Sequence, residues 1–381
     1  ELMKNIALGA LAVLMLACGG SEPAPQPVSP ALVAPPTNGP LPQLGQEDGG
    51  APTSKPAAAA KPTYPPPRPV TISLASAADD PVDQELKAGD AAFEADDLPN
   101  AEKHYRAAQK AAPKRAAPLV GLARVRMAKQ NVSYDFGIAK GNVEIAAAAN
   151  DLKKAVKMEP ALGAAQVELG RALLLLGDAK GAIDTLKTGV SLLPNEPEAH
   201  STLGVAWLAT GHPEEALGEM AQAAKLDPGN AARHGNYGTT LLMRGQTKEA
   251  IEEYRAAAAI DDKDARTHSD LGTALLGDNQ VIAAVPELQT ATTLDPDHAT
   301  YHSNLGYALQ IEGKLQQAED EYRRAIKLDP KLASAWINLA TLLAKDPKRR
   351  GEAKAALEQA KAIDPTDPRV KANLEELEQL K

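Results

Sequence analysis

Cysteine and aromatic residues are scarce in this chain. Cys18 is the single cysteine among 381 residues, so an intramolecular disulfide framework is excluded. Phe, Trp and Tyr make up 3% of the residues, and alanine dominates the apolar fraction. A core of small side chains requires elements that approach one another closely. The composition therefore predicts closely packed helices.

Excess positive charge is also absent. The formal net charge is −9 at pH 7. Nucleic-acid binding requires a cationic face against the phosphates, so this class of function is disfavoured. The acidic residues are interpreted as solvated helix surfaces.

Motifs of the common catalytic sites are missing as well. The sequence contains no HExxH, GxSxG, Walker loop or glycine-rich nucleotide turn. We therefore expect a protein that is not an enzyme, with no cofactor, no metal and no small-molecule substrate.

The N-terminus carries a short apolar stretch, Asn5 to Ala17, preceded by Lys4 and followed by Cys18. A membrane span needs about 20 apolar residues, so this stretch is typical of a signal peptide. The segment LMLACGG resembles the lipobox of bacterial lipoproteins. That resemblance implies removal of residues 1–17, lipidation of Cys18 and, because Gly19 follows, an outer-membrane lipoprotein that faces the periplasm. The alternatives are an ordinary signal peptide or a short anchor with an incidental cysteine.

A proline-rich segment follows. Fifteen of the 50 residues from 21 to 70 are proline, with alanine, glycine and serine between them. Such a segment buries too little apolar surface to offset its ordering entropy. We expect a disordered tether over 18–81; a PxxP recognition role is the alternative.

A regular sequence period begins after the tether. It is about 34 residues long and is visible in the even spacing of His200, His234, His268 and His302. Each unit holds two stretches with helical spacing of apolar residues, and most units close on Asp-Pro or Asp-Asp. The fold class is therefore all-α, built from repeated helix pairs.

The repeated residues resemble those of the tetratricopeptide repeat family. Leu-Gly pairs stand in the first helix, as in Leu203–Gly204 and Leu305–Gly306, and the second helix has alanine at positions such as Ala250 and Ala318. The resemblance implies a right-handed α-solenoid of about eight helix pairs and a C-terminal capping helix. The predicted repeats are 82–115, 116–162 with an insertion around 129–147, 163–196, 197–230, 231–264, 265–298, 299–332 and 333–366, with the capping helix over 367–381. Pro286 should bend or delay the second helix of its repeat.

The four histidines admit two interpretations. A metal or proton-relay ladder would need ligands close together, but equivalent positions of neighbouring helices lie about 8–10 Å apart. Trp336 occupies the same position in a later repeat. We therefore expect a structural packing role.

The resemblance implies a binding groove on the concave face formed by the first helices. Small polar side chains at repeated positions suit the backbone of an extended peptide. Asparagines at one of these positions could instead brace turns between adjacent helices, and the sequence does not decide between the two roles. The candidate groove residues are Ser201, Thr202, Asn236, Thr239, Ser269, Asp270, Thr273, Ser303, Asn304, Tyr307, Asn338 and Thr341.

These observations predict a lipid-anchored scaffold or assembly factor of the cell envelope that binds an extended peptide or a partner protein. Its plan resembles that of pilotin and gliding-motility lipoproteins. One alternative is an adaptor that regulates a peptidoglycan enzyme. Another is an enzyme with a site around Tyr134, Asp135 and Phe136, although no nucleophile there lies beside a base.

Overall fold

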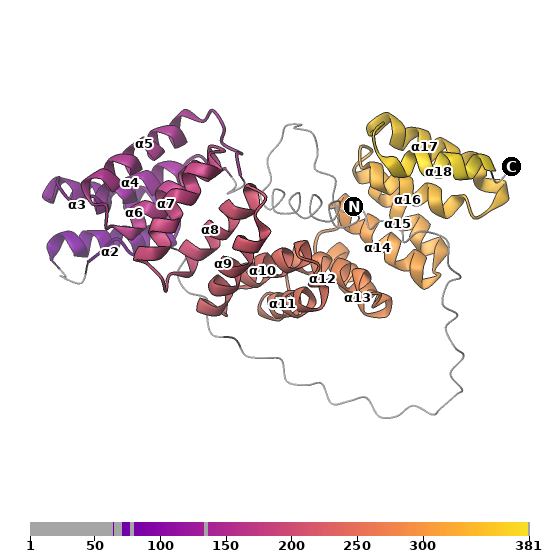
Figure 1. The fold of residues 1–381 in the computed structure, drawn as a ribbon, viewed down its shortest axis with the longest axis horizontal. Coiled ribbons are helices and arrows are strands. Elements are labelled where there is room, and N and C mark those ends of the chain that lie inside the picture. Colours follow the sequence, from indigo (N-terminus) through magenta and orange to yellow (C-terminus); the bar gives the residue numbers. More distant parts are fainter. Residues whose placement is uncertain (1–63, 65–70, 77–79, 133–135, 380–381) are drawn as a thin grey trace, which may run out of the picture. The chain divides into compact units, whose positions relative to one another are not determined.

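A computed structural model of the chain describes residue 64 and residues 71–76, 80–132 and 136–379 (Figure 1). The predicted signal peptide, Cys18 and most of the predicted tether lie outside the described residues. So do Tyr134 and Asp135 of the alternative enzyme site.

The described residues form helices and no strands, which confirms the predicted all-α fold class. The helices pack in consecutive pairs (Figure 1), and we call the first helix of each pair its A helix and the second its B helix. The pairs are α2 (Pro81–Glu94) with α3 (Leu98–Ala111), α4 (Ala117–Ala128) with α5 (Val143–Met158), α6 (Gly163–Leu175) with α7 (Ala179–Leu192), α8 (Pro197–Ala209) with α9 (Pro213–Leu226), α10 (Ala231–Met243) with α11 (Thr247–Ile260), α12 (Ala265–Gly277) with α13 (Val281–Leu294), α14 (Ala299–Glu312) with α15 (Leu315–Leu328), and α16 (Ala333–Leu343) with α17 (Arg350–Ile363). A 3₁₀ turn, η1 (Pro347–Arg349), precedes α17, and α18 (Pro368–Gln379) follows it.

These helices divide into two compact units. The first unit ends at Asp295 and contains α2 to α13, and the second begins at Pro296 and contains α14 to α18.

A left-handed residue separates the A and B helices of five successive pairs. Gly177, Gly211, Gly245 and Gly313 have φ between 74° and 88°, and Asn279 has φ 60°. Glycine adopts this conformation without the steric cost that a Cβ brings, and asparagine tolerates it better than most residues. The repeated turn therefore fixes where each B helix begins.

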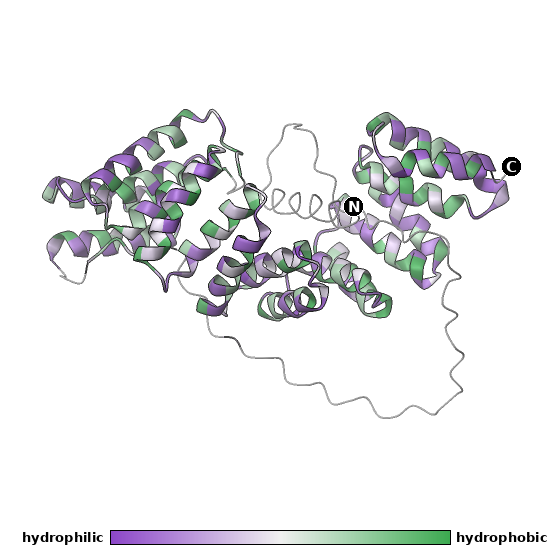
Figure 2. Cartoon of the chain, in the orientation of Figure 1, coloured by the Kyte–Doolittle hydropathy of each residue, from purple (hydrophilic) through white to green (hydrophobic). Residues whose placement is uncertain are grey.

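The core is made of small residues that let paired helices approach closely. Alanines of the B helices, such as Ala250 and Ala318, are fully buried. A Cβ added to Gly272 of α12 would lie 2.6 Å from Cγ of Leu288, and one added to Gly306 of α14 would lie 2.8 Å from Cδ1 of Tyr322. Apolar and polar residues alternate around the helices, consistent with one buried and one solvated face (Figure 2).

The segment from Thr71 to Ser76 differs from the expected tether, because it packs against the first unit. Ile72 and Leu74 are 5% and 3% exposed. The amide of Leu74 donates to Oδ2 of Asp90 on α2 at 2.8 Å. Two aliphatic side chains at alternate positions supply the apolar area that the proline-rich residues before them lack.

The insertion between α4 and α5 lies against the end of α6. The amide of Gly137 donates to the carbonyl of Leu174 at 2.9 Å, and the amide of Ala139 donates to that of Leu175 at 3.0 Å. The last carbonyls of a helix have no partner within it. The insertion therefore satisfies two of these groups and has a structural purpose.

Pro286 does not delay its helix, contrary to one of the two expected effects. α13 begins at Val281, the position of its repeat that corresponds to Thr247 at the start of α11, and continues to Leu294. The side chains of Ala284 and Leu288 remain fully buried around the proline. Packing of this face holds the helix where local propensity alone would interrupt it.

The predicted capping helix covers the end of the second unit. Val370 and Leu377 of α18 are buried, and Asp367 accepts a hydrogen bond from the amide of Arg369 at 2.9 Å. Asn373 of this helix donates to the hydroxyl of Thr341 on α16 at 3.4 Å.

Candidate functional site

The A helices of the first unit surround a cavity of about 740 Å³, which we call the groove. Its apolar walls come from Phe93, Leu174, Leu175 and Val205. Its polar lining consists of Thr71, Glu94, Arg124, Glu168, Arg171, Glu198, Ser201, Thr202, Asn230, Arg233 and Asn236, and Ala232 completes it. A cavity of this size with mixed lining is suited to hold part of a ligand.

Alternating charges lie along one wall of the groove. Arg124 of α4 pairs with Asp90 of α2 at 3.3 Å and with Glu168 of α6 at 2.7 Å. Arg171 of α6 pairs with Glu168 at 3.1 Å and with Glu198 of α8 at 2.5 Å. Each carboxylate is shared by neighbouring helices, so the pairs link four successive A helices.

Arg233 of α10 closes the series. Its guanidinium contacts Asp227 at 3.0 Å and Glu198 at 3.3 Å. It also donates to the hydroxyl of Ser201 at 2.6 Å and to the carbonyl of Pro197 at 3.2 Å. We call the seven residues Asp90, Arg124, Glu168, Arg171, Glu198, Arg233 and Asp227 the charge ladder.

Burial and pairing set the ionisation of the ladder. Desolvation raises the pKa of the Asp90 carboxyl, although the nearby Arg124 guanidinium opposes this effect. Burial would also raise the pKa of Glu168, but Arg171 and then Arg124 outweigh it and hold this pKa below its usual value. Arg124 is 2% exposed, and its pKa is raised by Glu168 and Asp90 in spite of its own burial. The ladder is therefore charged and internally compensated at its centre.

Two hydroxyl groups of the groove form hydrogen bonds with neighbouring protein groups. Its serine and threonine hydroxyls have no histidine beside them among the described lining residues. Ser201 instead accepts from Arg233, and Thr202 donates to the carbonyl of Glu198 at 2.7 Å. Hydroxyl and amide groups at its rim can serve as donors or acceptors for a peptide backbone.

Three predicted site residues of the first unit, Ser201, Thr202 and Asn236, line this groove. The others lie elsewhere. Thr239 is buried, and its hydroxyl bonds to that of Tyr254 at 2.9 Å. Ser269 is also buried, while Asp270 and Thr273 are partly exposed on α12. Buried Thr239 and Ser269 face packed helices rather than a surface that a partner can reach.

Five predicted site residues belong to the second unit. Ser303 of α14 is buried and so is closed to a partner. Asn304, Tyr307 and Asn338 are partly exposed, and burial raises the pKa of the Tyr307 hydroxyl. Thr341 of α16 is also partly exposed; its hydroxyl donates to the carbonyl of Ile337 at 2.9 Å and accepts from Asn373 of the capping helix at 3.4 Å.

Sequence reasoning missed the charge ladder, because its members other than Asp227 do not recur from one repeat to the next. A signal was nevertheless present. Arg124 stands in the apolar run VGLARVRMA and Glu168 in QVELGRALLL. A charged side chain within a helix that is apolar on most sides predicts a buried ion pair.

The periodic histidines make hydrogen bonds that the packing interpretation did not foresee. Nδ1 of His200 lies 2.6 Å from Oε2 of Glu219 on the paired B helix, and Nε2 lies 3.0 Å from the carbonyl of Pro194. His234, His268 and His302 repeat both contacts. Gln166 and Trp336 donate to the corresponding carbonyls of Pro160 and Pro330. This position supplies an N–H group that joins each A helix to the preceding loop.

Both ring nitrogens of His200 and His234 face acceptors, so each of these two rings donates to both only when it carries two protons. Burial lowers the pKa of His200, but Glu219 and the Pro194 carbonyl outweigh it, and the net pKa is raised; His234 behaves alike with Glu253 and Pro228. The described residues contain no cluster of three side chains positioned to hold a metal ion.

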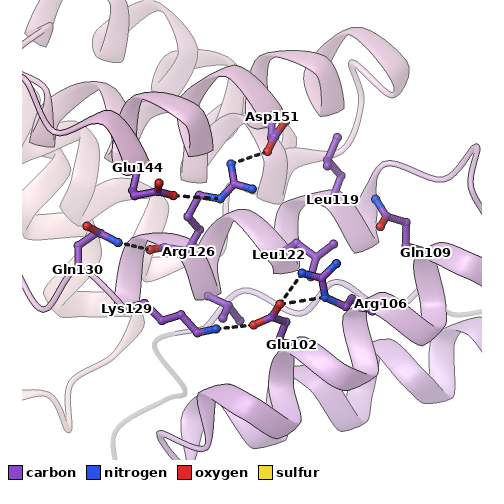
Figure 3. A pocket seen from close by; sticks show the side chains of 11 residues that line it. Glu102, Arg106, Gln109, Leu119, Leu122, Arg126, Lys129, Gln130, Glu144 and Asp151 are labelled. Atoms are coloured by element: carbon purple, nitrogen blue, oxygen red, sulfur yellow. Dashed lines mark hydrogen bonds and ion pairs between the residues drawn. The ribbon is translucent and has the colours of Figure 1, made fainter.

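A second cavity, of about 360 Å³, lies among α3, α4 and α5 (Figure 3). Leu119, Leu122 and Val125 contribute apolar lining. Around them Arg126 pairs with Asp151 at 3.0 Å, and Glu102 accepts from Arg106 and Lys129 (Figure 3). These ion pairs are partly exposed and are screened by solvent. Solvent therefore weakens the ion pairs of this cavity more than it weakens the buried ion pairs of the groove.

A tetratricopeptide repeat model matches residues 144–206, 207–274 and 309–377, and a second one with the same description matches 269–333. These matches cover more than half of the chain. The chain belongs to the tetratricopeptide repeat family. Members of this family are generally scaffolds for protein interactions. No curated protein matches the sequence.

Among solved structures, the APC/C hetero-tetramer Cut9–Hcn1 is similar over 77% of this chain and 55% of that chain, with 17% identity and a TM-score of 0.53. YrrB, described as a tetratricopeptide repeat protein with an unusual peptide-binding site, matches 49% of this chain and 96% of its own, with 19% identity and a TM-score of 0.44. PilF of Pseudomonas aeruginosa matches 57% and 98%, with 21% identity and a TM-score of 0.49. At these identities the similarities establish the fold alone. In the described part of this chain, no helix is both long and apolar enough to span a membrane.

Proposed function

We propose that this protein is a non-enzymatic scaffold that binds an extended segment of a partner protein in the groove of the first unit. The observation that carries the proposal is the groove itself, where apolar walls and polar rim groups converge on the A helices. The tetratricopeptide fold supports it, because stacked A helices form an extended binding surface.

We further propose that the protein acts in the cell envelope, lipidated at Cys18. The support is the apolar stretch that ends at this single cysteine, together with the proline-rich segment that separates it from the first helix. Replacement of Cys18 by Ser should abolish labelling with a fatty-acid analogue and release the protein from membranes. A Cys18→Ser protein that stays membrane-bound would contradict the anchor.

Site-specific photocrosslinking tests the groove. Ala232 is exposed and lines the groove, whereas Glu215 is exposed on the B helix α9. A photoreactive residue at Ala232 should give discrete adducts with partner proteins in envelope fractions, and one at Glu215 should not. Equal adducts at both positions, or none at Ala232, would refute the groove as the binding site.

A further inference from the structure

The chain holds one extended segment of its own on the A-helix surface that leads into the groove. From Thr71 to Ser76 the described backbone has no helix, and from Thr71 to Ala75 the side chains alternate between more and less exposed. Ser76 is exposed, and its hydroxyl donates to Oδ2 of Asp83 at 2.6 Å. Ile72 and Leu74 are buried, while Ser73 between them is exposed. This alternation is that of an extended strand with one face inward.

The A helices hold this segment by its backbone. The amide of Leu74 donates to Asp90 at 2.8 Å, and the amide of Ser76 donates to Asp83 at 2.9 Å. Arg124 donates to the carbonyl of Ile72 at 2.7 Å. Backbone groups are common to every sequence, so selectivity in this mode comes from the inward side chains.

The groove begins where this segment begins. Thr71 and Arg124 both line the cavity, which continues beyond them past Leu174 and Val205 to Asn236. Aliphatic walls therefore extend the same A-helix surface on which Ile72 and Leu74 are buried.

The charge ladder determines which side chains a bound peptide can direct into the groove. All three arginines that line the groove are paired with carboxylates, and each of Glu168 and Glu198 serves two arginines. A ligand carboxylate would have to displace a carboxylate of the ladder or lie beside it. A ligand ammonium would have to compete with buried guanidinium groups. Glu94 also lines the groove, but it is exposed, and solvent screens a pair formed there. Beside the buried ladder, either charge would lose hydration without gaining a free partner, which makes its burial unfavourable.

We propose that the groove selects an extended, electrically neutral peptide with aliphatic residues at every second position, held as the chain holds its own Thr71–Ser76. This inference rests on the proposed peptide-binding function and adds the chemistry of the ligand. Inward positions take uncharged aliphatic side chains. The intervening positions take small polar side chains, as in the chain's own segment, where the side chain of Ser73 is hydrogen-bonded to Asp90.

Synthetic peptides test the rule. The parent probe is a fluorescein-labelled nonapeptide with the sequence Ile-Ser-Leu-Ala-Ile-Ser-Leu-Ala-Ser, and its central isoleucine is replaced by Asn, Asp or Lys. Binding to the full chain is measured by fluorescence anisotropy. We expect the Asp and Lys peptides to bind about ten-fold or more weakly than the Asn peptide, which matches Asp in shape but has no charge. Replacement of the serine after the first isoleucine by Ala should change the affinity little, because a single hydroxyl contributes less than the burial of a charge costs.

Two chain variants locate the binding. Ala232→Arg places a long side chain at the groove and should weaken binding of the parent peptide, whereas Ala107→Arg, at an exposed position of α3 outside the groove, should not. If the Asp or Lys peptide binds as well as the Asn peptide, the neutral selection is wrong while the peptide groove stands. If no peptide binds, the inference is wrong, and crosslinking at Ala232 decides separately whether the groove binds a partner of another class.

Discussion

The A helices of the two units have the same helical backbone structure but carry different polar side chains. In the first unit they bury the charge ladder, in which Arg124 and Glu168 are nearly inaccessible. In the second unit α14 and α16 carry the uncharged Asn304, Tyr307 and Asn338. There Arg349 of η1 lies 2.6–2.7 Å from Glu319 of the B helix α15, away from the A helices that carry these polar groups. The residues that recur in every repeat therefore determine the helix pairs. The charged residues of the ladder, most of which do not recur, give the first unit its distinct surface.

Removal of one charge of the ladder should reveal the largest difference in stability between the two units. Arg124→Met leaves Glu168 and Asp90 without their shared guanidinium, and an uncompensated buried charge costs about 3–5 kcal/mol. Urea unfolding should show this loss of stability. Arg349→Met removes an ion pair near the surface of the second unit and should shift the unfolding midpoint much less.

A second variant separates charge from packing at the same site. Replacement of both Arg124 and Glu168 by Met should restore much of the stability that the single change removes, because fewer unpaired charges remain. Equal stability of the wild type and the Arg124→Met protein would show that the ladder is not a buried structural element.

The helix packing common to both units can be tested at glycine. Gly272→Ala and Gly306→Ala place a Cβ within 3 Å of Leu288 and Tyr322, respectively, and we expect each to cost about 1–3 kcal/mol. Gly235→Ala is the control, since nothing lies within 4 Å of the added Cβ and α10 should gain about 0.5–1 kcal/mol. Thermal or urea unfolding measures all three. A neutral effect at Gly272 or Gly306 would contradict the tight A–B contact.

The structural roles of residues that recur in each repeat could be predicted from the sequence, whereas the roles of residues that do not recur could not. Leu-Gly pairs and B-helix alanines recur in successive repeats because each pair of helices has the same contact, so they predicted the fold. Arg124 and Glu168 form an ion pair across repeats of unequal length, and Arg233 has no arginine one period before or after it. No period therefore indicates which charges meet. The sequence did not predict the burial of Ile72 and Leu74. The proline content of the segment indicates disorder on average, and it does not show that two aliphatic side chains at its end pack against the folded A helices.

Asp270 offers a way to make one A helix of the first unit resemble those of the second. Burial raises the pKa of its carboxyl to about 6, from an ordinary value of 3.8, although Arg266 opposes the shift. The folded chain binds this proton more tightly, so stability falls as the pH rises from about 4 to 6. Asp270→Asn introduces the residue found at the equivalent positions Asn236, Asn304 and Asn338.

The Asp270→Asn protein should gain about 1–2 kcal/mol at pH 7 and less at pH 4. Urea unfolding at the two pH values measures the difference. Asp320→Asn, an exposed change on α15 of the second unit, serves as the control and should have little effect. A gain that is the same at pH 4 and pH 7 would show that ionisation of Asp270 is not its cause.

The smallest expected effect concerns the histidine position that runs through both units. Glu219 and the Pro194 carbonyl raise the pKa of His200 despite its burial. The folded chain therefore holds the imidazolium proton more tightly than the unfolded chain, whose histidine titrates at about 6.5. Its stabilisation is complete below this pH and is lost as the pH rises through the folded pKa.

His200→Gln should reduce this pH dependence while it keeps the loop bond. Gln166 already donates to the Pro160 carbonyl at the equivalent position of α6, so glutamine can preserve the contact without a titrating group. We expect the variant to lose up to about 1 kcal/mol at pH 6 and to match the wild type more closely at pH 9. His212→Gln, at an exposed histidine outside the repeated position, provides the control for urea unfolding at both pH values. If His200→Gln retained the full pH dependence of the wild type, the doubly bonded ring would not be its source; if it lost stability equally at both values, the ring would act by shape, as the packing interpretation first held.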